Sequence, residues 1–171
     1  MQVDRMTAAK NGVTCKHFHA WERRSKHIHA QVYSNATARF AKRFLLELVE
    51  IGPYKILSIQ VDGGSEFMAD FETACEQMKI PLIVLPPAIP KYNGGVERGN
   101  RTFREEFYAC RDIIADSIET MRFDLRKAVE KYNTFKPHHA LKGKTPIEYR
   151  RRNQADSALV SKHLNLHTAQ H

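Results

Sequence analysis

Residues 56–64, ILSIQVDGG, are the stretch from which the fold can be worked out. The run from Ile56 to Val61 is continuously β-prone, as expected for a central strand that is buried on both faces. The residues that follow, Asp62-Gly63-Gly64, predict that the carboxyl end of this strand opens into a turn. The sequence therefore predicts a buried central strand with an acidic residue at its carboxyl end.

Three strands and one helix are predicted before this central strand. The strands are placed at Val3, at Val13 to Trp21 and at His27 to Tyr33. The last two are predicted to face each other across the polar turn 22–26, so that the sheet begins antiparallel. Apolar residues at helical spacing between Asn35 and Ile51 predict a helix that ends at Gly52-Pro53.

Helices and one short strand are predicted after the central strand. An apolar stripe predicts a helix that carries Phe67, Phe71, Ala74, Cys75 and Met78. Leu82 to Leu85 is a predicted strand, and further helices are predicted from Val96 onward. Thr145 is the expected N-cap of the last of these helices, with Glu148 at its third position. This order predicts an α/β fold in which helices pack on both sides of a mixed five-stranded sheet.

The length of 171 residues favours a single domain. We place the domain at residues 1–150 and a C-terminal tail, partly ordered at best, at 151–171, because the helical periodicity fades after Arg152. Apolar runs are shorter than the roughly 20 residues that span a bilayer, and the N-terminus lacks the pattern of a signal peptide. The expected location is the cytosol, with no membrane partner.

The charge of the chain favours a polyanionic partner. Its 27 Lys and Arg residues outnumber its 19 Asp and Glu residues, for a net charge of +8. Nucleic acid is the first class of partner that such a surplus attracts, through counterion release, and an anionic membrane is the second. The alternative is that the surplus serves solubility alone.

Three acidic residues stand where the predicted fold could bring them together. Asp4 is on the first strand, Asp62 ends the central strand, and Glu97 opens a helix. Carboxylate oxygens are the ligands that Mg²⁺ prefers, and two such ions can stabilise both the attacking and the leaving oxygen of a phosphodiester. With 19 acidic residues in the chain, the spacing alone fits a solvated surface equally well.

Several segments together resemble a known family. They are 2–4 (QVD), 61–67 (VDGGSEF), 90–102 (PKYNGGVERGNRT), 132–141 (YNTFKPHHAL) and 145–149 (TPIEY). These segments resemble the catalytic core of retroviral integrases and the related insertion-sequence transposases, which use an Asp, Asp, Glu triad on a ribonuclease H-like fold. The last two segments look more like bacterial transposases than like viral enzymes.

The resemblance implies a metal-dependent polynucleotidyl transferase with Asp4, Asp62 and Glu97 as its catalytic residues. The same three acids would hold Mg²⁺ or Mn²⁺, as two ions. The implied partner is DNA, both transposon ends and target, handled by a homodimer or higher oligomer in a prokaryotic cytosol. The competing hypothesis is a catalytically inactive DNA-binding or assembly module derived from a transposase.

Three features depart from the family pattern. Gly63 follows the second acid where the family often has Asn, and the retroviral interval to the third acid is one residue longer. Asp4 lies almost at the N-terminus, which leaves no room upstream for the helix-turn-helix region that such transposases usually carry. The sequence is therefore expected to be a fragment or a truncated copy.

Five further residues are candidates for binding DNA. Glu97, Arg101 and Arg104 have the i, i+4, i+7 spacing of one helix face, which is predicted to meet the phosphates. Lys91 and Asn93 on the preceding loop are expected to reach the same DNA, and Ser65 is placed to donate to a backbone oxygen. The alternative for Glu97 and Arg101 is an ordinary exposed ion pair.

Histidines and cysteines offer a competing zinc hypothesis. Residues of these types alternate on two predicted strands and would share one face, namely Cys15, His17, His19, His27 and His29. Zinc sites normally have tighter, turn-based spacing, and the three cysteines of the chain form no CxxC pair. Trp21 and Tyr33 are interpreted as packing residues, His138 and His139 as structural residues, and Arg150 to Arg152 as a solvated charged run.

Overall fold

The computed structural model describes residues 1–52, 55–86, 94–110 and 115–153. Its strands are β1 (Gln2–Lys10), β2 (Val13–Trp21), β3 (Ile28–Tyr33), β4 (Ile59–Val61) and β5 (Leu82–Val84). Its longer helices are α1 (Ala38–Ile51), α2 (Asp70–Gln77), α3 (Gly94–Thr102) and α4 (Ile118–Phe135). Three short helical segments complete this set, η1 (Ser65–Phe67), η3 (Phe103–Tyr108) and η4 (His139–Leu141), and a further helix covers 146–153.

The five strands form one mixed sheet in the order β3-β2-β1-β4-β5. The β1–β2 and β2–β3 pairs are antiparallel, and the β1–β4 and β4–β5 pairs are parallel. The predicted mixed five-stranded sheet is therefore confirmed. The central strand is shorter than predicted, because its regular pairing begins at Ile59 rather than at Ile56.

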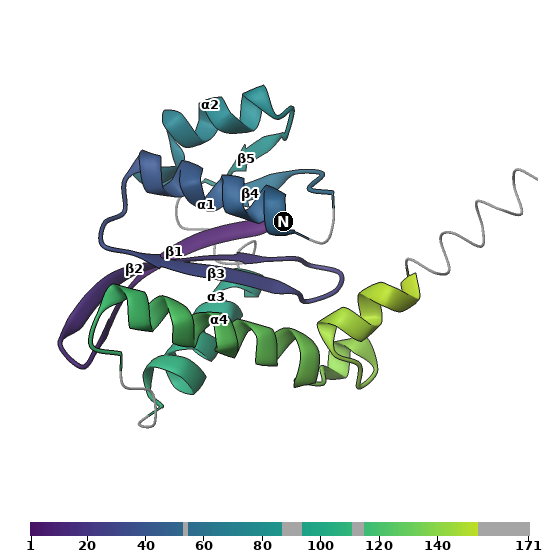
Figure 1. Cartoon of the computed structure of the whole chain (residues 1–171). Helices are drawn as coiled ribbons and strands as arrows, with labels where there is room; N and C mark the ends of the chain where they lie inside the picture. Colours follow the sequence, from purple (N-terminus) through teal and green to yellow (C-terminus); the bar gives the residue numbers. More distant parts are fainter. Residues whose placement is uncertain (53–54, 87–93, 111–114, 154–171) are drawn as a thin grey trace, which may run out of the picture.

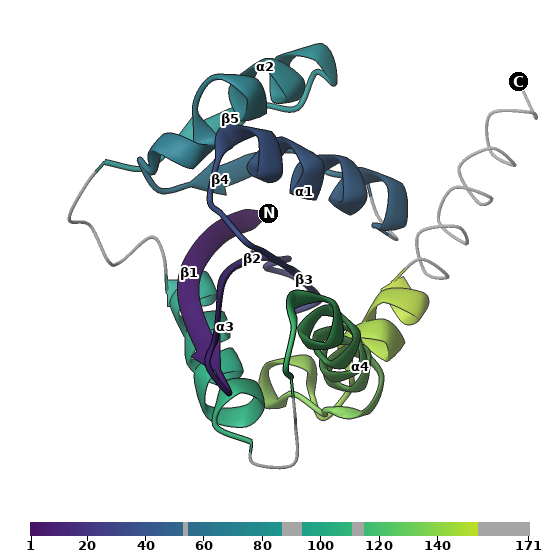
Figure 2. The ribbon, with the colours of Figure 1, turned by 60° about the vertical axis from the view of Figure 1, so that its left-hand side comes forward.

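Helices cover both faces of the sheet, as predicted. Figure 1 shows α1 and α2 on one side and α3 and α4 on the other, and Figure 2 shows the same layers from a second direction. Each face has its own apolar core. The core under α1 and α2 is built around Phe18, Phe44 and Phe67, and the core under α3 and α4 around Phe103, Phe107 and Leu125.

A local sequence signal explains where the last described helix begins. Thr145 Oγ1 accepts the backbone N–H of Glu148 at 3.3 Å, and Glu148 Oε2 accepts the N–H of Thr145 at 2.8 Å, which confirms the predicted capping box.

The predicted helix carrying Phe67 to Met78 is broken into two segments. Ala69 has φ of 51°, a left-handed conformation that separates η1 from α2.

The edge strand β3 is held by side chains of α4. Asn133 accepts the backbone N–H of Ile28 at 3.0 Å and donates to the carbonyl of the same residue at 2.8 Å. Arg122 Nε donates to the carbonyl of Val32 at 2.9 Å. These bonds satisfy backbone groups that an edge strand would otherwise leave open to pairing with another chain.

No helix in the part of the chain that the structure describes is both long enough and apolar enough to cross a membrane. Most of the predicted tail, from residue 154 onward, lies outside the described residues.

Candidate active site

Asp4 and Asp62 are neighbours on parallel strands. Gln2 of β1 is in register with Gln60 of β4, and each acid follows two residues later. A step of two residues keeps the register and the face of the sheet, and paired parallel strands are about 4.8 Å apart. The two aspartates that the sequence places on separate strands therefore lie side by side.

The face that carries these two acids is the one covered by α3. Val3 and Val61 belong to the core under α1 and α2, so the residues that follow them point to the opposite face. Asn100 of α3 supports this placement, because its Nδ2 donates to Asp4 Oδ2 at 2.7 Å. The other oxygen, Asp4 Oδ1, accepts the backbone N–H of Arg5 at 2.7 Å. Both oxygens of Asp4 are thus oriented by the protein.

Uncompensated negative charge gathers at Asp62. Partial burial raises the pKa of its carboxyl group, and the negative charges of Asp4 and Glu66 raise it further. The backbone N–H of Gly64 donates to Asp62 Oδ1 at 3.2 Å and, with the positive charge of Arg5, opposes the rise. A cation that approaches this carboxyl group would favour its ionised form, so the site favours cation binding.

Glu66 is a member of this acidic group that the sequence prediction missed. It is 6% exposed, and its Oε1 accepts from Arg5 Nε at 2.5 Å. A side chain at residue 64 would displace these acids, because a Cβ there would lie 2.9 Å from Glu66 Oε2 and 3.1 Å from Asp62 Oδ1. The only available signal was the position of Glu66 within the VDGGSEF segment, and nothing in that segment indicates an ion pair with β1.

Glu97 lies on the first turn of α3, which packs against β1 and β2. It is exposed, and it precedes Asn100 by three residues. Residues at this spacing are neighbours on a helix surface, so Glu97 stands one turn from the side chain that binds Asp4. The third predicted acid is therefore on the helix that covers the two aspartates.

Two of the predicted donor groups fit a divalent metal. Adjacent carboxylates with a raised pKa at Asp62 match the oxygen ligands that Mg²⁺ and Mn²⁺ require. Among residues 1–52, 55–86, 94–110 and 115–153, no three or more His, Cys, Asp or Glu side chains are arranged as a metal site. Asp4 and Asp62 thus fit as ligands, and metal binding by all three acids stays a prediction.

The predicted DNA-binding residues fall in different settings. Arg101 and Arg104 are exposed, but Arg101 Nε pairs with Glu105 Oε1 at 2.8 Å, so its ion pair is with Glu105 and not with Glu97. Arg104 lies in η3, a π-helical segment whose wider turns do not continue the α-helical spacing from Glu97. Ser65 is exposed at the start of η1. Lys91 and Asn93 lie outside the described residues.

The histidines do not share one face. His17 Nδ1 lies 2.8 Å from the Tyr108 hydroxyl, and His19 Nε2 lies 3.3 Å from the carbonyl of Val96, so both point toward η3 and α3. His29 instead stacks on Phe44 of α1, on the opposite face, with ring centroids 5.4 Å apart. The expectation of one shared face is wrong, because His29 pairs with Ala20, which alternates with His19 along β2.

Burial keeps the two histidines under α3 neutral. It lowers the pKa of His17 well below its usual value and that of His19 to about 4. A Cβ at residue 99 would lie 3.1 Å from His19 Nε2, so Gly99 lets α3 approach the sheet closely. His17 and His19 therefore support the helix that carries Glu97.

The chain resembles integrases in sequence. Residues 78–146 match the family model described as an integrase core domain, a range that contains Glu97 and excludes both aspartates. Over 138 residues the chain is 30% identical to the Pol polyprotein of equine infectious anemia virus (strain Wyoming). That match covers 80% of this chain but only 11% of the polyprotein, so the chain spans about a ninth of the relative's length.

Solved structures show the same fold. The catalytic core domain of BIV integrase superposes with a TM-score of 0.70 over 91% of this chain and 97% of that one, at 23% identity. A chain of the simian T-cell lymphotropic virus intasome in complex with PP2A regulatory subunit B56 gamma gives 0.69 over 80% of this chain and 49% of that one, at 19% identity. The resemblance drawn from the sequence is thereby confirmed: residues 78–146 match the integrase core family, and the chain has the ribonuclease H-like fold of an integrase catalytic core.

Proposed function

We propose that this chain is the catalytic core of a DDE-type transposase or integrase, which cuts and joins DNA ends by in-line phosphoryl transfer. The observation that carries the proposal is the proximity of Asp4 to Asp62, whose charges interact, together with the bond from Asn100 of α3 to Asp4. The basic surplus of the chain and its similarity to integrase cores support DNA as the substrate.

The chain's own groups prepare the site in three ways. Asn100 and the N–H of Arg5 fix the direction of the Asp4 oxygens, and the N–H of Gly64 fixes Asp62. The Arg5 side chain holds Glu66 in an ion pair. Asp4, Asp62 and Glu97 would hold two Mg²⁺ or Mn²⁺ ions. When bound, such ions offset the charge of the phosphodiester and activate the attacking oxygen.

A homodimer or higher oligomer is the proposed working form. α1 exposes three apolar side chains, Leu46 at 44%, Val49 at 41% and Ile51 at 64%. Apolar groups gathered on one exposed helix are a common feature of protein contacts. Sedimentation of the purified chain at several concentrations tests this proposal, and a monomer at all concentrations, with and without DNA, would contradict it.

An end-joining assay tests the catalytic proposal. Labelled DNA carrying the transposon ends is incubated with the full-length gene product in Mg²⁺, in Mn²⁺ and in chelator. We expect strand transfer products with either metal and none in chelator. DNA that is bound but never cut would favour the inactive binding module over the enzyme.

A further inference from the structure

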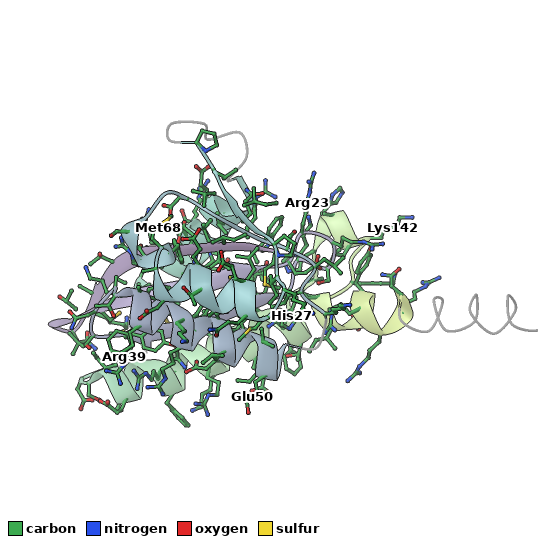
Figure 3. The ribbon with its side chains drawn as sticks, turned by 90° about the horizontal axis from the view of Figure 1, so that it is seen from above. Arg23, His27, Arg39, Glu50, Met68 and Lys142 are labelled. Atoms are coloured by element: carbon green, nitrogen blue, oxygen red, sulfur yellow. The ribbon has the colours of Figure 1, made fainter. Side chains whose placement is uncertain are left out.

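A basic pocket lies beside α3, where three segments of the chain meet. It has a volume of about 480 Å³ and lies between the β2–β3 turn, the first residues of α3 and the segment after α4. Its lining includes Trp21, Lys26, Arg98, His138 and His139. Figure 3 shows the turn and that segment at the same end of the molecule, where Arg23 and Lys142 are labelled.

Positive charge in this pocket is only partly compensated. Burial lowers the pKa of Lys26, and the positive charges of Arg23 and Arg98 lower it further, against an opposing effect of Glu22. None of the described residues that line the pocket is acidic. The acids that act on Lys26 and His138 have other partners: Glu22 accepts the backbone N–H groups of Arg24 and Ser25 at 2.9 and 2.6 Å, and Glu106 pairs with Lys136. The pocket therefore favours an anion.

His138 lines the same pocket, and one of its ring nitrogens lacks a hydrogen-bond partner among the described residues. Its Nε2 is buried and has no hydrogen-bond partner within the described part of the chain. The ring is fixed against Tyr132, with centroids 4.8 Å apart. Because a buried polar atom without a partner is unfavourable, a ligand that hydrogen-bonds to this nitrogen would be stabilised.

Close contacts fix this pocket relative to the candidate active site. Lys26 Nζ lies 4.7 Å from the centroid of the Trp21 ring and donates to the carbonyl of Arg23 at 2.7 Å. A Cβ at residue 95 would lie 2.2 Å from the Trp21 ring, so only glycine allows α3 to start against it. Glu97 belongs to the same first turns of α3, so the pocket and the predicted third acid are carried by one helix.

We propose that this pocket binds a backbone phosphate of the DNA, close to the phosphodiester that Asp4, Asp62 and Glu97 act on. Lys26 and Arg98 supply its charge, and His138 and His139 supply hydrogen bonds from the segment 132–141. That segment is thereby assigned a role in positioning DNA. The inference rests on the proposed function, because it takes DNA as the substrate.

Binding to a fluorescein-labelled random duplex, measured by anisotropy over a range of salt concentrations, tests the charge. The variant is Lys26→Gln, and the matched control is Arg39→Gln, an exposed residue of α1 that does not line the pocket. We expect Lys26→Gln to reduce the slope of log K against log salt by about one and Arg39→Gln to leave it unchanged. Equal losses in Lys26→Gln and Arg39→Gln would overturn the proposal.

A methylphosphonate scan then identifies the phosphate. Duplexes that carry one neutral linkage at a time are bound to wild-type protein and to Lys26→Gln, each in a Glu97→Gln background that removes cleavage. We expect one linkage whose neutralisation weakens wild-type binding about tenfold and leaves Lys26→Gln binding unchanged. If both proteins respond alike at every linkage, the pocket binds no phosphate. Because this readout needs no cleavage, the methylphosphonate scan can fail while the joining assay succeeds. The scan can equally succeed while the joining assay fails.

Discussion

The two faces of the sheet are built from different chemistry. Under α1 and α2, the core consists of fully buried aromatic rings such as Phe18, Phe44 and Phe67, with Phe18 lying 5.8 Å from Phe44 between centroids. Under α3 and η3, fully buried His17 and His19 share the core with apolar side chains. The first face is built mainly of aromatic and apolar side chains, with His29 stacked on Phe44, whereas the second encloses two fully buried imidazoles. The face that supports the acidic site therefore also holds the fully buried histidines.

The largest effect is expected on the α3 face, from Glu97→Gln. Loss of one metal-ligating carboxylate should reduce strand joining by at least about 10³-fold, because such ligands support several kcal/mol of transition-state stabilisation. The unfolding midpoint should stay unchanged, since Glu97 is exposed. Glu130→Gln, an exposed acid on α4, is the matched control and should join DNA normally. Full activity in Glu97→Gln would remove Glu97 from the mechanism.

The next largest effect is expected on the α1 face, from Phe44→Ala. Phe44 is fully buried, so its truncation should lower the free energy of unfolding by about 3–5 kcal/mol. Phe123→Ala is the matched control, because Phe123 on α4 is 56% exposed and should cost less than about 1 kcal/mol. Urea unfolding measures both. Similar losses in the two variants would contradict the burial of Phe44 in the core under α1 and α2.

Acid should act on the α3 face through His19. The pKa of His19 is about 4 in the folded chain and about 6.5 when unfolded, so the unfolded chain binds more protons between these values. Stability is therefore retained above pH 6.5 and lost as the pH falls toward 4, by about 3 kcal/mol from His19 alone. Urea midpoints at pH 7 and pH 5 test this. His19→Gln should flatten the dependence, and an unchanged dependence would assign it to other groups.

Much of the fold could be predicted because its signals are local. Alternation along 27–33, helical spacing along 35–51 and the capping box at Thr145 depend on residues within one element, and the structure follows them. The break between η1 and α2 and the hydrogen bonds between distant residues were not predicted. The left-handed backbone at Ala69 depends on tertiary packing, and the Asn133 bonds to Ile28 join residues 105 positions apart.

The candidate site was predictable to a similar extent. Asp4 could be placed on the first strand and Asp62 at the end of the central strand, but the parallel pairing that brings these strands together joins segments far apart in the sequence and could not be predicted. The partners of those acids could not be predicted. Asn100 reaches Asp4 across 96 positions, and Arg5 reaches Glu66 across 61, so neither contact has a periodic signal in the sequence.

The smallest effect is expected from the exposed arginines beside Glu97. Arg101→Ala together with Arg104→Ala should weaken binding to DNA of any sequence and reduce the salt slope by one to about two. The lower value follows if Arg101 remains engaged by Glu105, its partner at 2.8 Å, and contributes little to binding. Arg126→Ala with Lys127→Ala removes the same charge from exposed positions on α4 and is the matched control. Equal slopes for the two double variants would mean that DNA responds to net charge rather than to this face, and the separation of the two faces would then not extend to DNA binding.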